Sequence, residues 1–158
     1  MLIAPDLLGE LIAHAREEYD AECCGVIAYP AAVVNERALA ATGVGAAGGE
    51  RERAEPELPR AMQVRRARNV YASRKRFEID GLELLRAKTA FEERGWDIGA
   101  IYHSHTHTAP YPSQTDINFA ANWPGLEWVI VGLAGEQPEV RCYLIDDGVV
   151  RELELEVR

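Results

Sequence analysis

Two histidines and an aspartate lie close together in the sequence and could bind one metal ion. His103 and His105 alternate at the end of an apolar run, and Asp116 follows eleven residues after His105. Alternate residues of a strand point to the same face, so we expect the two imidazoles to lie side by side. Two imidazoles and one carboxylate leave one tetrahedral position open, as in catalytic zinc sites. A set without a thiolate also suits other divalent metals, so zinc is the leading choice among several.

Each part of this pattern also has a purely structural explanation. An isolated His-x-His pair can be polar residues on a solvated strand face, and Ser113 to Asp116 is by itself a helix capping box. The combination favours a metal site, because Pro110-Tyr111-Pro112 is a stiff turn that can hold the strand and helix ends together. Capping and ligation are compatible, since Ser113 can satisfy backbone donors while the Asp116 carboxylate faces a cation.

The surrounding sequence predicts the elements that position these residues. A strand is predicted over 97–105, and a short helix from Ser113 to about residue 122. Further helices are predicted over 5–19 and from Asp80 to the Gly95 stop. Further strands are predicted over 23–29, 127–133, 139–145 and 149–157, with a strand that ends at 77–79 and a weaker strand candidate over 33–40. Helices mixed with closing hairpins predict a three-layer or sandwich-like α/β (α+β) fold on a mixed sheet.

Length and composition restrict the class of protein. The 158 residues suit one domain, 1–158, that folds without staples, and residues 42–60 predict a flexible surface loop. The balance of 17 Lys and Arg against 26 Asp and Glu gives a net charge of −9, which disfavours nucleic acid and anionic membranes as partners. Neither an export signal nor a membrane span is predicted. Three cysteines, two of them adjacent, predict reduced thiols and a cytoplasmic protein.

The spacing of the chemical residues resembles the signature of the JAMM/MPN+ metallopeptidases, the Mov34-type family that includes deubiquitinating enzymes. His103-Ser104-His105 is followed after seven residues by Ser113 and after two more by Asp116. In that family a glutamate far upstream, between the first helix and a strand, completes the site, and Glu22 occupies that position. Residues 100–106 and 111–116 are especially similar to small stand-alone bacterial members. Those members release cysteine from the C-terminus of a ubiquitin-like sulfur-carrier protein or cleave related conjugates.

The resemblance implies an architecture, a cofactor and a role for each site residue. The fold would be of JAMM/MPN type, which is cytidine-deaminase-like, with a mostly antiparallel sheet and flanking helices. His103, His105 and Asp116 would hold one Zn²⁺ per chain. Glu22 would accept the proton of the attacking water, and Ser113 would stabilise the oxyanion. From its local sequence alone Glu22 is better explained as a solvated residue of a turn.

The expected function is zinc-dependent hydrolysis of a peptide or isopeptide bond at the C-terminal Gly-Gly end of a ubiquitin-like sulfur-carrier protein or its conjugate, with cysteine as one leaving group. One alternative is a broader isopeptidase that removes carrier-like modifiers from lysine. A second is a non-catalytic MPN-like interaction module, which the complete ligand set disfavours. A zinc nucleobase deaminase would need His-x-Glu and Pro-Cys-x-x-Cys, and neither occurs.

Several residues remain outside this assignment. The segment Arg60 to Arg76 holds seven of the 17 basic residues, and either contact with an acidic carrier or a charged strand edge explains it. His107 is expected to lie on the rim of the site. Cys23 and Cys24 are expected to be buried, unreactive thiols on opposite sides of a strand. A homodimer is left open.

Overall fold

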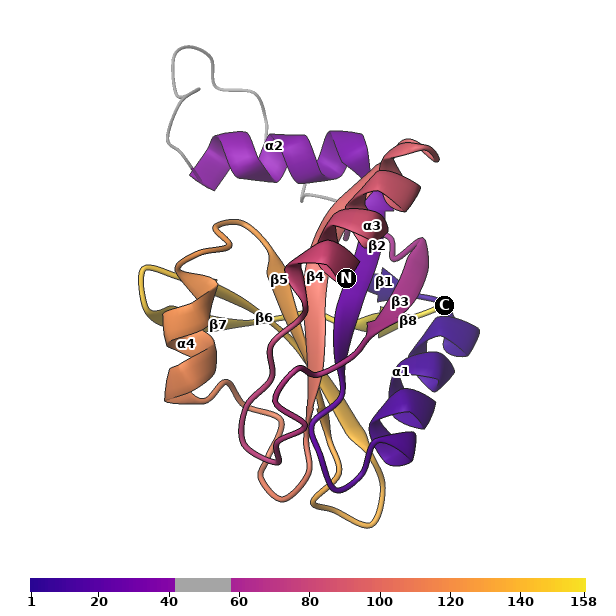
Figure 1. Ribbon diagram of the computed structural model, residues 1–158. Coiled ribbons are helices and arrows are strands. Elements are labelled where there is room, and N and C mark those ends of the chain that lie inside the picture. The colour runs from indigo at the N-terminus through magenta and orange to yellow at the C-terminus, as the bar shows by residue number, and fades with distance from the viewer. Residues whose placement is uncertain (42–57) are drawn as a thin grey trace.

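A six-stranded mixed sheet forms the centre of the computed structural model, which describes residues 1–41 and 58–158 (Figure 1). The strand order is β3-β2-β4-β5-β6-β7. Strands β4 and β5 run parallel, and every other neighbouring pair in this sheet is antiparallel. The strands are β2 (Cys24–Pro30), β3 (Gln63–Ala67), β4 (Trp96–His105), β5 (Glu127–Gly132), β6 (Glu139–Asp146) and β7 (Val149–Leu153). The predicted fold class is confirmed, whereas most of the predicted loop 42–60 lies outside the described residues.

Helices pack on both faces of this sheet and divide the core into two clusters. Helix α1 (Pro5–Glu17) buries Leu11 in the first cluster. Helices α3 (Gly81–Glu92) and α4 (Gln114–Ala120) bury Phe91 and Ala120 in the second. The adjacent Cys23 and Cys24 fall in different clusters, as alternation along an extended chain requires. Burial raises the pKa of both thiols to about 12, which agrees with the expectation of unreactive cysteines.

The weak strand candidate over 33–40 is wrong, because this segment is the helix α2 (Ala31–Ala41). Val33 and Val34 suggested a strand, but the remaining Ala, Leu, Glu and Arg residues are strong helix formers. Arg37 of α2 also forms an ion pair with the fully buried Glu127 at the start of β5. This tertiary contact fastens the helix across the end of the sheet at which β4 begins (Figure 1).

Two further strand predictions differ from the structure. The strand predicted over 149–157 ends at Leu153, and the chain then forms β8 (Glu156–Val157), which pairs in parallel with β1 (Leu2–Ile3) in a small second sheet. The backbone N–H of Glu156 donates to the Met1 carbonyl at 2.9 Å, so the new partner explains the change of sheet. Residues 77–79 form no strand, only a single bridge between Asn69 and Ile79. The first error involves pairing between segments far apart in sequence, whereas the bridge at Ile79 lies within one loop.

None of the helices among the described residues combines the length and the apolar composition that crossing a bilayer requires.

Candidate metal centre

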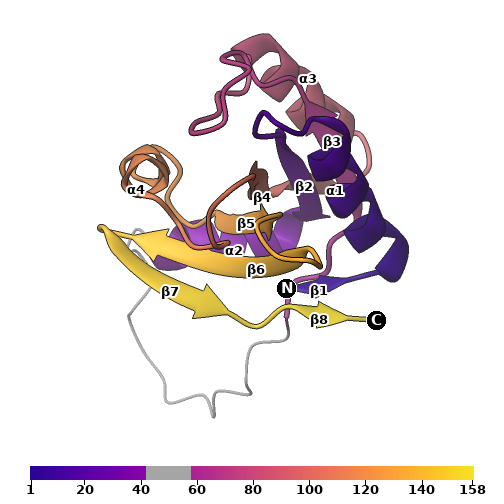
Figure 2. The same ribbon diagram turned by 90° about the horizontal axis from the view of Figure 1, so that it is seen from below.

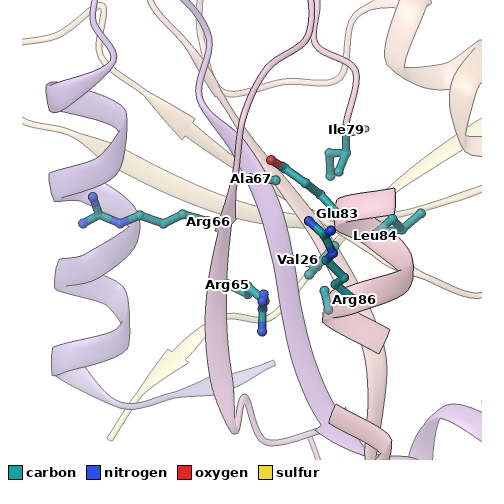
Figure 3. Close-up of a pocket in the computed structure, with 9 residues that line it drawn as sticks. Val26, Arg65, Arg66, Ala67, Ile79, Glu83, Leu84 and Arg86 are labelled. Atoms are coloured by element: carbon teal, nitrogen blue, oxygen red, sulfur yellow. The ribbon is translucent and has the colours of Figure 1, made fainter. Parts of the chain in front are cut away.

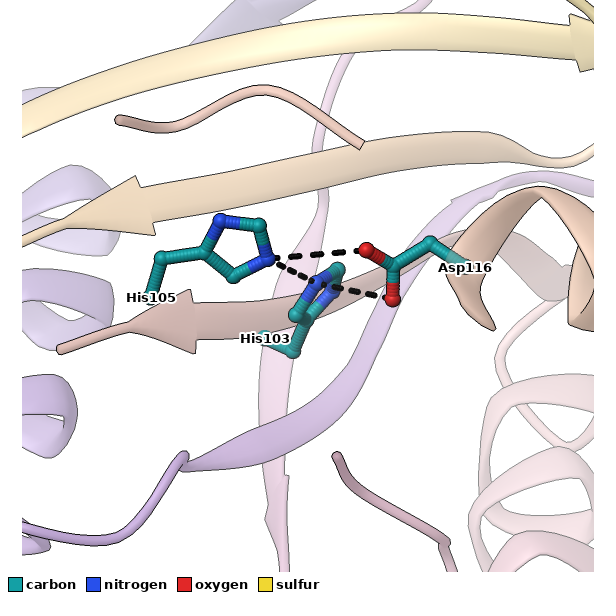
Figure 4. Close-up of side chains that lie close together, drawn as sticks. All are labelled: His103, His105 and Asp116. Carbon is teal, nitrogen blue, oxygen red and sulfur yellow. Dashed lines mark hydrogen bonds and ion pairs between the residues drawn. The ribbon is translucent and has the colours of Figure 1, made fainter. Parts of the chain in front are cut away.

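The candidate ligands meet where β4 ends and α4 begins. His103 and His105 are the last alternate residues of β4, which lies in the sheet between β2 and β5 and is therefore held on both sides. Asp116 is in the first turn of α4, after the extended N-cap residue Ser113. Seen from below, the carboxyl end of β4 lies between α4 and the segment that leads into α3 (Figure 2). All three side chains are buried and point toward one another (Figure 4).

The distances between the ligand atoms suit a small tetrahedral cation. His103 Nε2 lies 3.1 Å from His105 Nε2 and 3.2 Å from Asp116 Oδ1, and His105 Nε2 lies 3.5 Å from Asp116 Oδ2. Ligands about 2.0–2.1 Å from a tetrahedral ion are about 3.3–3.4 Å apart, so the separations between these three side chains are close to those of ligands that share one ion. Each of the three residues offers one ligand atom, and these atoms all lie within 4.8 Å of one another.

Hydrogen bonding and ring stacking set the orientation of the two imidazoles differently. His105 Nδ1 lies 2.9 Å from the Ala109 carbonyl oxygen, so Nδ1–H donates there and Nε2 keeps its lone pair for a cation. His103 Nδ1 is buried without a hydrogen-bond partner among the described residues. The ring of Phe77 instead stacks on His103, with a centroid distance of 4.5 Å and an interplanar angle of 23°. Packing therefore fixes His103, and a backbone carbonyl fixes His105.

Asp116 contributes to both the helix cap and the ligand cluster. Its Oδ2 accepts hydrogen bonds from the backbone N–H and the hydroxyl of Ser113, each at 2.7 Å, while the Ser113 hydroxyl oxygen accepts from the Asp116 N–H. The predicted capping box is confirmed. Burial alone would favour neutral Asp116, but its electrostatic interaction with His103 and its hydrogen bonds from Ser113 hold its pKa well below the usual range. The carboxylate is therefore ionised and aimed at the imidazoles, as a metal ligand must be.

Glu22 is buried beside this cluster, and its backbone is held on three sides. Its N–H donates to the Ser73 carbonyl at 2.8 Å, its carbonyl accepts from Asn69 Nδ2 at 3.0 Å, and the next N–H, of Cys23, donates to Ser104 Oγ at 2.8 Å. Burial raises the pKa of Glu22 to about 7, and the Asp116 charge acts in the same direction, whereas His105 opposes it. A carboxyl group that titrates near neutral pH is suited to both accepting and donating a proton.

Two ion pairs share the carboxylate of Asp20, which lies two residues before Glu22. His107 is exposed, and its Nε2 lies 2.9 Å from Asp20 Oδ1. Arg74 Nε lies 3.0 Å from the other oxygen of the same carboxylate. Asp20 thus links His107, which follows β4, to Arg74, which lies between β3 and α3. His107 is outside the group of ligand atoms, in agreement with its expected place on the rim.

Two hollows flank loop 69–79, which connects β3 to α3. The first has a volume of about 200 Å³ and touches the candidate ligand Asp116; its lining residues are Tyr71, Arg76, Phe77, Glu78, Thr115, Asp116 and Phe119. The second lies between β3 and α3, where Arg65 and Arg86 are on the helix side and Arg66 points toward α1 (Figure 3). Arg66 forms an ion pair with Glu17 at 2.6 Å. The basic segment therefore provides an exposed edge strand, one of the two explanations left open by the sequence.

Comparison with known proteins agrees with this geometry. Residues 4–146 match the family Prok-JAB, described as prokaryotic homologs of the JAB domain. The chain belongs to this family. It is 31% identical over 153 residues to the CysO-cysteine peptidase of Mycobacterium tuberculosis, covering 96% of this chain and 87% of that relative. It is 30% identical over 132 residues to the desampylase of Haloferax volcanii, covering 81% and 77%.

The architecture of this JAB-family protein also agrees with a solved relative. The JAB1/MPN domain protein of Archaeoglobus fulgidus has a TM-score of 0.55 at 16% identity, with 99% of this chain and 98% of that chain covered. The expected JAMM/MPN architecture is therefore confirmed. With the matches to full-length peptidases, the chain is a small hydrolase of the JAMM/MPN peptidase family.

Three residues that border this site were not singled out from the sequence. Asn69 and Ser104 hold the Glu22 backbone, and Phe77 stacks on His103. Ser104 lies inside the recognised motif, so its position between the histidines could have suggested a supporting role. Asn69 and Phe77 are ordinary residues of a loop, and only the folded chain brings them to the site.

The pKa of Glu22 gives a prediction for the metal-free protein. Glu22 has an ordinary pKa of 4.5 and about 7 when folded, so between these values the folded state holds more protons than the unfolded state. Its contribution to the free energy of unfolding therefore falls as pH rises from about 4.5 to 7. Glu22→Gln is expected to remove this cost and to stabilise the metal-free protein at pH 8 by up to about 3 kcal/mol.

Urea unfolding of the wild-type and Glu22→Gln proteins from pH 4.5 to 8, with chelator present, measures this effect. The difference in unfolding free energy should grow with pH and level off above about pH 7. Glu136→Gln, at an exposed loop position, is the control for the change in charge. Parallel pH curves for the wild-type and Glu22→Gln proteins would contradict the prediction.

Proposed function

We propose that the chain is a zinc-dependent peptidase that hydrolyses the bond after the C-terminal Gly-Gly of a ubiquitin-like sulfur-carrier protein, with release of cysteine. The observation that supports it most is the convergence of His103 Nε2, His105 Nε2 and an Asp116 oxygen beside buried Glu22. The names of the two relatives, a CysO-cysteine peptidase and a desampylase, support action on such carrier conjugates.

His103, His105 and Asp116 would hold the zinc ion, because their atoms match its spacing and preferred donors. Zinc in such a site acts as a Lewis acid that lowers the pKa of water toward 7 and polarises a carbonyl. Magnesium is a poorer fit, since it prefers octahedral oxygen ligands and two of the three donors are imidazoles.

Two residues of the chain would move or stabilise charge during hydrolysis. Glu22 would accept the proton from the attacking water as the new C–O bond forms, and would then pass it to the leaving amine as the C–N bond breaks. Ser113 would turn its hydroxyl from Asp116 toward the oxyanion of the tetrahedral intermediate. Both groups border the ligand cluster.

The hollow beside Asp116 offers a place for the extended end of a substrate. Apolar Phe77 and Phe119 and the polar Arg76 and Glu78 line it, and it opens next to one candidate ligand. A glycine-rich tail has no bulky side chains and can approach buried ligands closely. A hollow of about 200 Å³ next to a buried ligand would therefore favour a Gly-Gly end over a bulkier sequence.

Two matched substrates test the proposal. The zinc-loaded protein is incubated with a carrier–cysteine adduct and with the same carrier joined to a lysine side chain, and the products are followed by mass spectrometry. Preferred hydrolysis of the cysteine adduct is the expected result. Preferred cleavage of the lysine conjugate would favour the broader isopeptidase, and no cleavage of either by fully loaded protein would overturn the proposal.

A further inference from the structure

Asn69 is a buried polar residue just beyond β3, with 8% of its surface exposed. All four of its side-chain hydrogen-bonding positions are used. Nδ2 donates to the carbonyls of Glu22 and Arg76, each at 3.0 Å, and Oδ1 accepts from the N–H groups of Tyr71 at 3.1 Å and Glu78 at 3.2 Å. A primary amide has two donor hydrogens and two acceptor lone pairs, so this environment uses its full capacity.

The four partners belong to two parts of the site. Glu22 precedes β2, whereas Tyr71, Arg76 and Glu78 belong to loop 69–79 and line the hollow beside Asp116. The same loop provides Phe77, whose ring stacks on His103. One side chain therefore connects the backbone of the candidate base to the loop that packs on a candidate ligand.

Loop 69–79 also has a conformation that needs support. Ala72 has a φ of 44°, in the left-handed region that a residue with a Cβ atom rarely adopts. The bond from the Tyr71 N–H to Asn69 Oδ1 is an Asx-type turn, and the Ala72 N–H donates to the Asn69 carbonyl at 3.1 Å. Ser73, the next residue, accepts the N–H of Glu22. The turn around Asn69 therefore also positions the Ser73 carbonyl, the second group of this loop that binds the Glu22 backbone.

From this arrangement we infer that Asn69 is a positioning residue for the peptidase reaction. Its side chain joins the Glu22 backbone to loop 69–79 and so holds both in place beside the candidate metal ligands. The expected effect on kcat rests on the proposed function. The link between Glu22 and loop 69–79 rests on the four hydrogen bonds alone. Asn69 has no role in the assigned set of ligands and catalytic groups. It acts through Glu22 and through the wall of the hollow.

Asn69→Asp isolates the two donated bonds. Aspartate keeps the shape and both acceptor positions, so the bonds from Tyr71 and Glu78 can remain, but it offers no donor to the Glu22 and Arg76 carbonyls. We expect kcat on the carrier–cysteine adduct to fall about 10–100-fold with a smaller change in KM, because displacement of a catalytic group by about 1 Å costs rate more than binding. Bound zinc should stay at one per chain. Asn69→Ser is the second variant, since its smaller side chain cannot bridge the two carbonyls and adds no charge.

Asn122→Asp is the matched control, because Asn122 is exposed and its Nδ2 also donates to a backbone carbonyl, that of Phe119 at 3.3 Å. This variant should keep the wild-type kcat. Wild-type kcat in zinc-loaded Asn69→Asp or Asn69→Ser would overturn the inference, as would a loss of activity explained entirely by loss of zinc.

Amide hydrogen exchange gives a readout that needs no activity. In Asn69→Asp or Asn69→Ser, exchange should become faster at the Glu22 and Cys23 amides and over residues 70–78, while the amides of β4 and β5 keep their protection. An unchanged pattern, or faster exchange throughout the sheet, would overturn the local link. If the wild-type protein cleaves neither carrier substrate, the proposed function fails, while the exchange data still decide whether Asn69 holds Glu22.

Discussion

Glu22→Gln is expected to lower kcat of the zinc-loaded protein by about 10²–10⁴-fold, the usual contribution of a positioned general base. Glutamine has nearly the same shape as glutamate but cannot accept and return a proton at neutral pH. The backbone bonds of Glu22 to Ser73 and Asn69 do not involve its side chain, so they should survive the change. The loss should therefore appear in the chemical step, with zinc content retained and the melting temperature not lowered.

Turnover on the carrier–cysteine adduct, zinc per chain and thermal unfolding measured on the same samples check this prediction. Glu18→Gln, four residues earlier and exposed, makes the same change of charge at the surface and should keep wild-type kcat. A fully zinc-loaded, folded Glu22→Gln protein with near wild-type kcat would remove Glu22 from the mechanism. The assignment to the peptidase family would still stand, because that assignment does not depend on the role of Glu22.

The sequence predicts that His103, His105 and Asp116 come together because these residues are local. His103, His105 and Asp116 occupy one strand, turn and helix, so strand alternation and a capping box are enough to expect convergence. Glu22 is different, since 81 residues separate it from His103. Only the resemblance to the JAMM/MPN+ signature indicated its proposed role as the general base. Its local sequence favoured a solvated turn, whereas the folded chain buries it.

Two of the errors in the predicted elements also arise from contacts between segments that are far apart in the sequence. Residues 33–40 form a helix that is fastened by Arg37 to buried Glu127, and residues 156–157 leave their predicted strand to pair with β1. Neither partner could be identified from a short window of sequence. Asn69 shows the limit most clearly, because an asparagine in a basic loop gives no sign that its amide bonds to Glu22. Periodicity predicts the elements, whereas long-range polar contacts decide how the site is held.

Removal of the metal is expected to abolish turnover while the protein stays folded. The two core clusters bury their apolar residues without any ligand, and a chain of this length forms a sufficient core alone. Structural zinc sites behave differently, since their loss unfolds small domains. Incubation with a chelator should therefore leave the circular dichroism spectrum unchanged, and added zinc should restore kcat. Unfolding by chelator, or full turnover after its use, would contradict a catalytic zinc.

Asp116→Asn tests the same site through one ligand. The asparagine oxygen can still accept the Ser113 N–H, so the cap of α4 is kept, but the negative charge that faces His103 and His105 is lost. We expect zinc affinity to fall by more than about 100-fold, since even supporting residues of a metal site are worth 10–100-fold. The matched change Asp146→Asn, at the exposed end of β6, should bind zinc normally. Equal zinc affinity of Asp116→Asn and wild type, by competition titration, would show that the carboxylate caps the helix and does not bind the metal.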